Sequence, residues 1–212
     1  MVSMRDESWR GHSSWRRVAF AVLFAAVVAL GGCKQKQQTD MAPLDQAGMW
    51  FSNVQELRGF NLTQEEVSGL VEARQAGFSD DNCIELVRLA RQKHESFTDG
   101  DAIANLLRAG VSSQTIMQLA HMNQLGPWAG EALVMHLAKL SDAIVLQVAQ
   151  RRVAGQPVLS GEKLAQLHDV GYSEAQLSEL IERGTTDAEA DRVIDAHNRA
   201  SGQGFHHQHR GH

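Results

Sequence analysis

The chain has 212 residues, a length that suits one domain or at most two. Acidic residues outnumber basic ones by 25 to 20, and four of the arginines lie in the first 32 residues, which leaves 16 basic against 23 acidic residues in the remainder. This balance argues against a nucleic-acid partner, because such a partner binds to a basic surface. It argues equally against electrostatic attachment to anionic lipid.

The chain begins with a segment that has the features of an export signal. Arg16 and Arg17 precede an apolar run of thirteen residues, 18–30, which ends at Gly31-Gly32. A basic start, a short apolar core and small residues at its end are typical of a secretory signal peptide. A membrane-spanning helix needs about 20 apolar residues, so this run is too short to remain as a permanent span. Residues 1–32 are therefore predicted to be a cleaved leader.

The end of this leader resembles the lipobox of bacterial lipoproteins, in which Leu, a small residue and Gly or Ala precede an invariant Cys. Leu30-Gly31-Gly32-Cys33 fits at all four positions. The resemblance implies that Cys33 receives a diacylglycerol, becomes the first mature residue and is acylated at its amino group, by a fatty acid such as palmitate. Because Lys34 differs from the Asp that retains such proteins in the inner membrane, the resemblance implies the periplasmic side of the outer membrane. The alternatives are an ordinary signal peptide followed by an unrelated Cys, and a twin-arginine export route through Arg16-Arg17.

Residues 33–43 are polar and are predicted to form a flexible tether. From residue 44 to residue 200 another pattern recurs. A hydrophobic residue is followed directly by a Ser or Thr, and a second apolar residue stands four positions after this Ser or Thr. This pattern is typical of a helix start, where the hydroxyl accepts a hydrogen bond from a first-turn N–H and the preceding apolar side chain packs across the turn. The predicted caps are Thr63, Ser79, Thr98, Ser112, Ser141, Ser160 and Ser173, with capping boxes at Thr63–Glu66 and Ser173–Gln176.

Tight turns are predicted to join these helices in pairs. Gly77, Gly110 and Gly171 each follow an apolar helical stripe and precede a hydrophobic–Ser pair, as expected for a left-handed residue that closes an αα-hairpin. Lys139 occupies the equivalent place in the third hairpin along the chain, which is therefore expected to turn differently. Successive turns are 33, 29 and 32 residues apart, a period typical of helical-hairpin repeats.

The sequence therefore predicts an all-α domain of stacked αα-hairpins, a helical-repeat or solenoid-like bundle over residues 44–200. It is weakly similar to short helical repeats of uncharacterised bacterial proteins, a similarity that implies no function. The predicted helices are 44–58, 63–76, 79–94, 99–109, 112–124, 128–138, 141–153, 160–169, 173–183 and 186–199.

The candidate metal site is a group of histidines at the C-terminus: His206, His207, His209 and His212. Neutral imidazoles in a short tract can share a copper, nickel or zinc ion. The alternative is that residues 201–212 form a disordered His-rich tail. His136 and His168 hold equivalent places in adjacent hairpins, but helices pack about 8–10 Å apart, which is too far for a shared ion.

No catalytic residue is predicted, because the serines are explained as caps. Carboxylates such as Asp80 and Asp187 lie in first helical turns, where they complement the helix dipole. No cofactor is expected besides the covalent lipid on Cys33. Cys83 is predicted to be a core residue, with a lone reactive thiol as the alternative.

Two aromatic segments have no evident place in a core built from Leu and Ala. Met49-Trp50-Phe51 and Trp128 either cap the ends of the core or form an exposed patch that meets a partner or the lipid surface. The resulting hypothesis is a non-enzymatic envelope lipoprotein, held to the membrane by its lipid, whose helical surface binds another envelope protein. The alternatives are a metal-handling protein that uses the His-rich tail, and an envelope enzyme or regulator with an unrecognised site.

Overall fold

The computed structural model describes residues 39–126 and 128–206, and every regular element within these ranges is an α-helix. The predicted all-α class is therefore confirmed. No helix in the described ranges is both long enough and apolar enough to cross a membrane. The helices are α2 (Ala42–Gln46), α3 (Phe51–Arg58), α4 (Gln64–Gln75), α5 (Asp80–Gln92), α6 (Gly100–Ala109), α7 (Ser113–His121), α8 (Ala129–Leu137), α9 (Asp142–Val153), α10 (Gly161–Asp169), α11 (Glu174–Arg183) and α12 (Asp187–His206).

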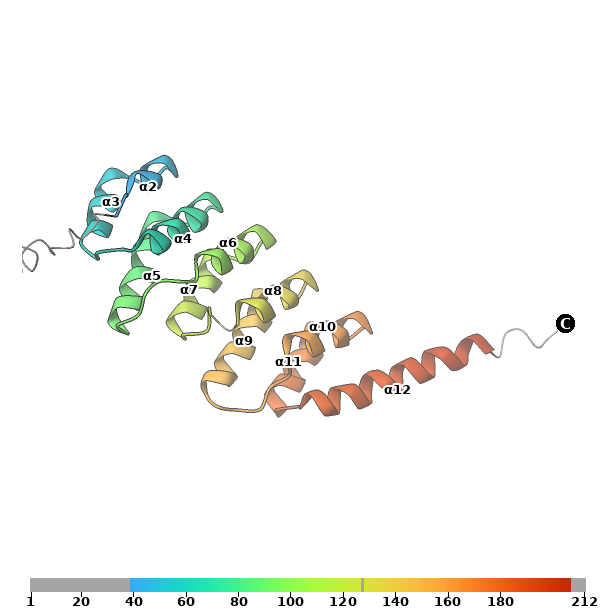
Figure 1. The fold of residues 1–212 in the computed structure, drawn as a ribbon. Helices are drawn as coiled ribbons and strands as arrows, with labels where there is room; N and C mark the ends of the chain where they lie inside the picture. Colours follow the sequence, from blue (N-terminus) through green and yellow to red (C-terminus); the bar gives the residue numbers. More distant parts are fainter. Residues whose placement is uncertain (1–38, 127, 207–212) are drawn as a thin grey trace, which may run out of the picture. The chain divides into compact units, whose positions relative to one another are not determined.

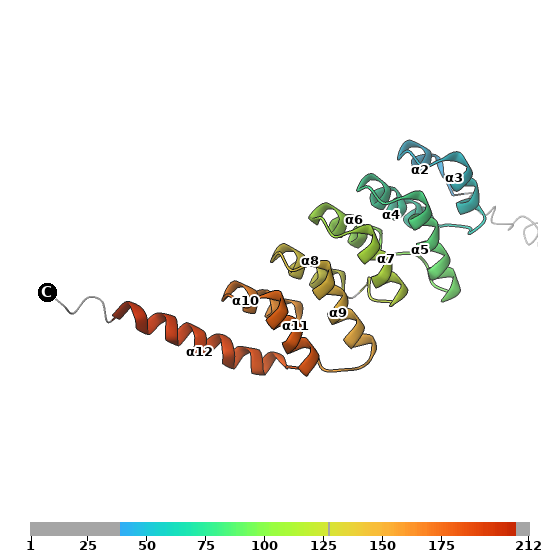
Figure 2. The ribbon, with the colours of Figure 1, turned by 180° about the vertical axis from the view of Figure 1, so that it is seen from behind.

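These helices form two layers, because each one packs against the helix two places earlier in the chain. The even-numbered helices α2 to α12 make the first layer and the odd-numbered helices α3 to α11 make the second (Figure 1). Figure 2 shows the successive hairpins side by side from the opposite direction. Apolar side chains of both layers join in one core that extends from Met41 to Ala190. The stacked αα-hairpins are thus also confirmed.

Each hairpin turns at a residue with a left-handed backbone. The φ angle is 102° at Gly77 and Gly110, and it is 65° at Lys139. The expectation that the hairpin at Lys139 turns differently is wrong, because a lysine can enter this region at a cost in strain. The N–H of Leu140 then donates to the carbonyl of Met135, closing the turn with the same bond as the other hairpins.

One further hairpin precedes those predicted. The single helix expected over 44–58 is wrong: it is broken into α2 and α3 around Gly48, whose φ is 80°. This turn has the same Gly–hydrophobic start, but Trp50 stands where the other hairpins have Ser. The N-terminus of α3 is closed instead by Asp80, whose Oδ2 accepts from the N–H of Trp50 at 2.8 Å and from Nδ2 of Asn53 at 2.9 Å.

The helical unit begins earlier and ends later than the predicted range 44–200. Thr39 donates its hydroxyl proton to the carbonyl of Leu62, and Met41 is buried. Residues 39–43 therefore belong to the helical unit rather than to the predicted tether. Helix α12 continues to His206, beyond the predicted end at 199. The predicted leader, residues 33–38 of the tether and residues 207–212 lie outside the described residues.

Most of the predicted hydroxyl caps are present, and both capping boxes form. The hydroxyls that accept from a first-turn N–H are those of Thr63, Ser79, Ser112, Ser160 and Ser173. The predictions at Thr98 and Ser141 are wrong. Helix α6 starts later, at Gly100, where a Cβ atom would lie 2.2 Å from the Cα of Gly69, so the backbones of α4 and α6 meet without side chains between them. The hydroxyl of Ser141 donates to Glu174 instead.

Candidate functional site

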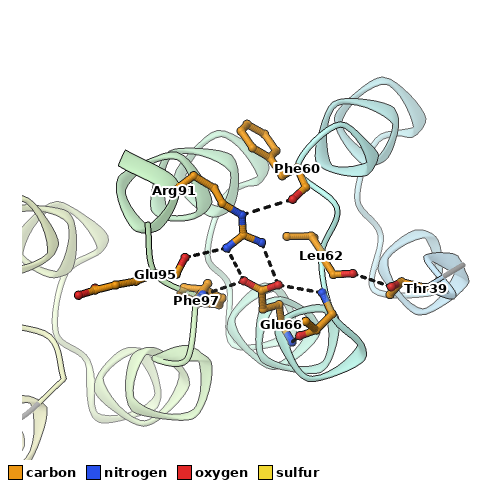
Figure 3. A network of polar contacts seen from close by, with 8 residues as sticks. Thr39, Phe60, Leu62, Glu66, Arg91, Glu95 and Phe97 are labelled. Atoms are coloured by element: carbon orange, nitrogen blue, oxygen red, sulfur yellow. Dashed lines mark hydrogen bonds and ion pairs between the residues drawn. The ribbon is translucent and has the colours of Figure 1, made fainter. Parts of the chain in front are cut away.

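A buried ion pair joins the first three hairpins. Glu66, which is 1% exposed, lies at the start of α4, and Arg91 lies near the end of α5. Their contact is bidentate, with Nη1–Oε1 and Nη2–Oε2 distances of 2.7 and 2.9 Å (Figure 3). Glu66 also accepts from the backbone N–H groups of Thr63 and Phe97, each at 2.8 Å. Each carboxylate oxygen therefore has two donors.

The guanidinium of Arg91 extends this network to the loops on either side. Its Nε donates to the carbonyl of Phe60 at 3.3 Å, and its Nη1 donates to the carbonyl of Glu95 at 2.9 Å. Burial alone would raise the pKa of Glu66, but the hydrogen bonds from Arg91 and from the two backbone N–H groups outweigh it and lower this pKa. Glu66 is thus ionised and fully bonded at neutral pH, which is the environment of a structural carboxylate rather than of a proton carrier.

Other carboxylates bind the N-terminus of the preceding helix in the same layer. Oδ2 of Asp142, on α9, accepts from the N–H of Ser112 at 3.1 Å and from the hydroxyl of Thr115 at 2.8 Å. Glu174, on α11, accepts from both the N–H and the hydroxyl of Ser141. We call the four residues with this role the inter-hairpin caps: Asp80, Asp142, Glu174 and Asp187.

The donors around two of the inter-hairpin caps, Asp80 and Asp142, lower the pKa of these carboxyl groups. Burial would raise the pKa of Asp80, but the N–H of Trp50, Asn53 and Arg74 together lower it, and Arg74 Nε lies 2.6 Å from Oδ1. Burial would raise the pKa of Asp142 as well, but the hydrogen bonds from Ser112 and Thr115 outweigh it and lower this pKa. These acids therefore hold hairpins together, besides complementing their own helix dipoles as the sequence predicts.

A pocket of about 280 Å³ lies where α5 and α7 end, beside the loops that follow them. Lys93, Glu95 and Asp99 are among its lining residues, and Nζ of Lys93 donates to Oδ1 of Asn123 at 2.6 Å. Burial raises the pKa of the Asp99 carboxyl; Lys93 opposes this rise, and Glu95 adds to it. The pocket thus combines two carboxyl groups, one of which holds its proton more strongly than an ordinary Asp.

The surface of the first layer carries an apolar pair on α8. Val134 is 41% exposed and Leu137 is 67% exposed. Counted back from the hairpin turns, the equivalent residues are polar in the neighbouring helices, namely Glu72 and Gln75 in α4, Asn105 and Arg108 in α6, and Gln166 and Asp169 in α10. We call Val134 and Leu137 the α8 patch. An apolar pair at positions that are elsewhere polar is a candidate contact for a partner.

The aromatic segments divide between core and surface. Met49 and Trp128 are buried, and the guanidinium of Arg152 lies over the Trp128 ring. Trp50 and Phe51 are 76% and 67% exposed. Met49 and Trp128 therefore belong to the core, whereas Trp50 and Phe51 face solvent.

The structure buries Cys83 completely, which confirms its core assignment. Burial, with a smaller contribution from Asp80, raises the pKa of this thiol to about 12, so it is not a reactive nucleophile at neutral pH. Cys33, the predicted lipidation site, lies outside the described residues.

The histidines do not form a described metal site. Nδ1 of His136 lies 3.6 Å from Oδ1 of Asp142, and within the described ranges no three His, Cys, Asp or Glu side chains are placed to hold an ion. His206 is the last residue of α12. The remaining residues of the candidate metal site lie outside the described residues: His207, His209 and His212.

Sequence reasoning missed the inter-hairpin caps and the Glu66–Arg91 pair. The acids themselves were visible in first helical turns, but their partners lie 25 to 33 residues away. A signal for the caps does exist, because an acid in the first turn recurs about one repeat after the helix start that it binds. Compared with known proteins, the chain matches no family model, no curated protein and no solved structure.

Proposed function

We propose that this protein is a lipid-anchored envelope lipoprotein whose helical hairpins bind another envelope protein without catalysing a reaction. The lipid is attached at Cys33, and it holds the helical unit at the periplasmic face of the membrane. Because residue 34 is Lys, this membrane is the outer membrane in the proposal. Stacked hairpins offer a long continuous surface for a partner, which is the common use of helical repeats.

The observation that carries the proposal is the commitment of the buried polar groups to structure. Glu66 has four donors, and the inter-hairpin caps are bonded to helix N-termini. The hydrogen bonds of these acids therefore hold the hairpins together, which supports a structural role for them. Several large apolar side chains are exposed at the surface of the stack, among them the two of the α8 patch.

The α8 patch suits an apolar segment of a protein partner. The surrounding positions on α6 and α10 are polar, so the patch would be the dry centre of a contact with a polar rim. A single apolar anchor at such a centre often contributes most of the binding energy.

The test is cross-linking in the native envelope, followed by purification of the lipoprotein with its bound partner. Leu137→Glu places a charge in the α8 patch, and Gln75→Glu makes the matched change at the equivalent exposed position of α4. We expect the cross-linked partner to disappear with Leu137→Glu and to remain with Gln75→Glu. Retention in both variants would refute the patch, and hydrolysis of cell-wall or peptide substrates by the purified protein would refute a purely binding role.

The anchor has a separate test. Cys33→Ser should leave a protein that keeps its leader and no longer partitions into detergent with the membrane fraction. Unchanged size and unchanged partition would refute lipidation at this residue.

The pocket at the ends of α5 and α7 favours one second candidate, an envelope enzyme or its regulator. Glu95 and Asp99 share this pocket, and the raised pKa of Asp99 suits a general acid. Any hydrolytic activity of the purified protein should then be lost in Asp99→Asn. Because the Asp99 side chain makes no capping bond to α6, this change is not expected to unfold the helix.

A further inference from the structure

The first hairpin ends the stack with two exposed aromatic side chains. Trp50 and Phe51 are adjacent at the start of α3, and both side chains are largely exposed, at 76% and 67%. Terminal repeats of helical stacks normally have a polar outer face, because no neighbour covers them. A Trp–Phe pair at such an end requires an explanation.

Comparison with the other hairpins shows what these two positions normally do. Trp50 stands at the position that precedes the helix, which is Ser79, Ser112, Ser141 and Ser173 in the later hairpins. Phe51 stands at the first helical position, from which Asp142 and Glu174 reach back to the preceding helix of the layer. No described helix precedes α3 in this layer, so within the described residues Phe51 has no preceding helix to bind.

Neither aromatic side chain is needed to complete the hairpin. The N–H of Trp50 is bonded to Asp80, and Met49 supplies the buried contact of the turn. The exposed rings therefore contribute little to the folding of the unit, whereas leaving them in water is unfavourable.

The chain length before the helical unit places this end of the stack within reach of a lipid on Cys33. Six residue-to-residue steps separate Cys33 from Thr39, so the link extends at most about 20 Å. Thr39 is bonded to Leu62, which follows the end of α3, and Trp50 precedes the start of this helix. The eight residues of α3 span about 12 Å. A membrane surface that holds the lipid of Cys33 can therefore also touch Trp50.

We propose that Trp50 and Phe51 insert into the surface of the membrane to which the protein is anchored, so that the first hairpin lies against the bilayer and the stack extends away from it. This inference rests on the lipid anchor of the proposed function. Tryptophan is suited to the boundary between headgroups and acyl chains, because its ring is apolar and its N–H is polar. The acidic balance of residues 33–212 disfavours anionic lipid, so the contact is a hydrophobic one with zwitterionic lipid.

The chain itself provides the means to test the contact. Residues 33–212 contain two cysteines, and only Cys33 is expected to react at neutral pH, because Cys83 is buried with a pKa of about 12. Cys33 can therefore be coupled to a maleimide lipid in phosphatidylcholine vesicles, whether or not cells lipidate it. The same residues contain two tryptophans, Trp50 and the buried Trp128. Trp50 emission then reports membrane contact through quenching by brominated phosphatidylcholine.

In a Trp128→Phe variant, Trp50 is the emitting tryptophan of residues 33–212. We expect coupling to the vesicles to shift its emission to shorter wavelength, and brominated lipid to quench most of this emission. The matched Trp50→Phe variant, in which Trp128 alone emits, should show neither effect. If Trp128→Phe does not fold by circular dichroism, the difference between wild type and Trp50→Phe gives the same signal. Equal Trp50 emission in brominated and unbrominated vesicles would overturn the proposal and leave the aromatic pair to a protein partner. That result would say nothing about lipidation in cells, which the Cys33→Ser experiment tests separately.

Discussion

The left-handed lysine at the third predicted turn leads to a stabilising substitution. Lys139 has a φ of 65° and an exposed side chain, whereas the turns at Gly77, Gly110 and Gly171 have glycine. A left-handed backbone costs a residue with a Cβ about 1–2 kcal/mol. Glycine removes this cost, but it loosens the unfolded chain by about 0.4–1 kcal/mol. Lys139→Gly should therefore stabilise the protein by about 0.5–1 kcal/mol.

A change of this size raises the melting temperature of a unit of this length by about 1–4 °C, which circular dichroism or differential scanning calorimetry can measure. Lys139→Asn should fall between the wild type and Lys139→Gly, because Asn tolerates the left-handed region better than Lys. Lys139→Val should destabilise, since a β-branched residue is an outlier there.

Gly110 provides the opposite control. Its φ of 102° lies farther from the left-handed minimum than that of Lys139, and a Cβ atom would be 3.2 Å from Nε2 of His136. Gly110→Val should therefore lower the melting temperature more than Lys139→Val. A Lys139→Gly protein that melts at or below the wild-type temperature, or equal losses in the two Val variants, would refute the reasoning from backbone strain.

Three other predictions concern the buried groups. Glu66→Gln removes the charge that Arg91 binds and should cost about 2–3 kcal/mol at neutral pH, less than a fully buried pair because Arg91 is partly exposed. Folding lowers the pKa of Glu66, so the wild type itself loses this stability as the pH falls below the ordinary glutamate pKa of about 4.3. The difference in unfolding free energy between wild type and Glu66→Gln, measured by urea denaturation, should therefore shrink over the same pH range. Asp80→Asn should cost about 1–2 kcal/mol and Asp81→Asn, at the exposed next residue, less than about 0.5 kcal/mol, so equal melting shifts would contradict the inter-hairpin cap. Cys83 should resist thiol reagents at about pH 8 until the protein is denatured, as mass spectrometry of labelled samples can show.

The sequence was informative wherever one residue type carries out one local task. Glycine before a hydrophobic–Ser pair predicted the turns at Gly77, Gly110 and Gly171, because the left-handed backbone and the hydroxyl cap are both properties of a few consecutive residues. The first hairpin was missed because Trp50 replaces the serine, and its cap comes from Asp80, 30 residues later. Lys139 was misjudged because a lysine can adopt the glycine conformation at a modest cost.

Contacts between hairpins were beyond local reasoning. The pairing of Glu66 with Arg91 depends on which side of each helix faces its neighbour, and the sequence shows only that both residues lie near helix ends. The exposure of Trp50 and Phe51 was likewise undecided, since aromatic residues at the end of a stack are equally compatible with covering the core and with facing solvent.

The direction of the inter-hairpin caps gives the second layer an order of completion during synthesis. Helix α3 leaves the ribosome with an open N-terminus and is closed only after Asp80 emerges, and α9 waits in the same way for Glu174. In this layer α3, α7 and α9 each receive a carboxylate from the helix two places later, whereas α5 is capped by its own Ser79. The last helix of this layer in the described chain, α11, has no such successor, and it carries its own complete capping box of Ser173 and Gln176.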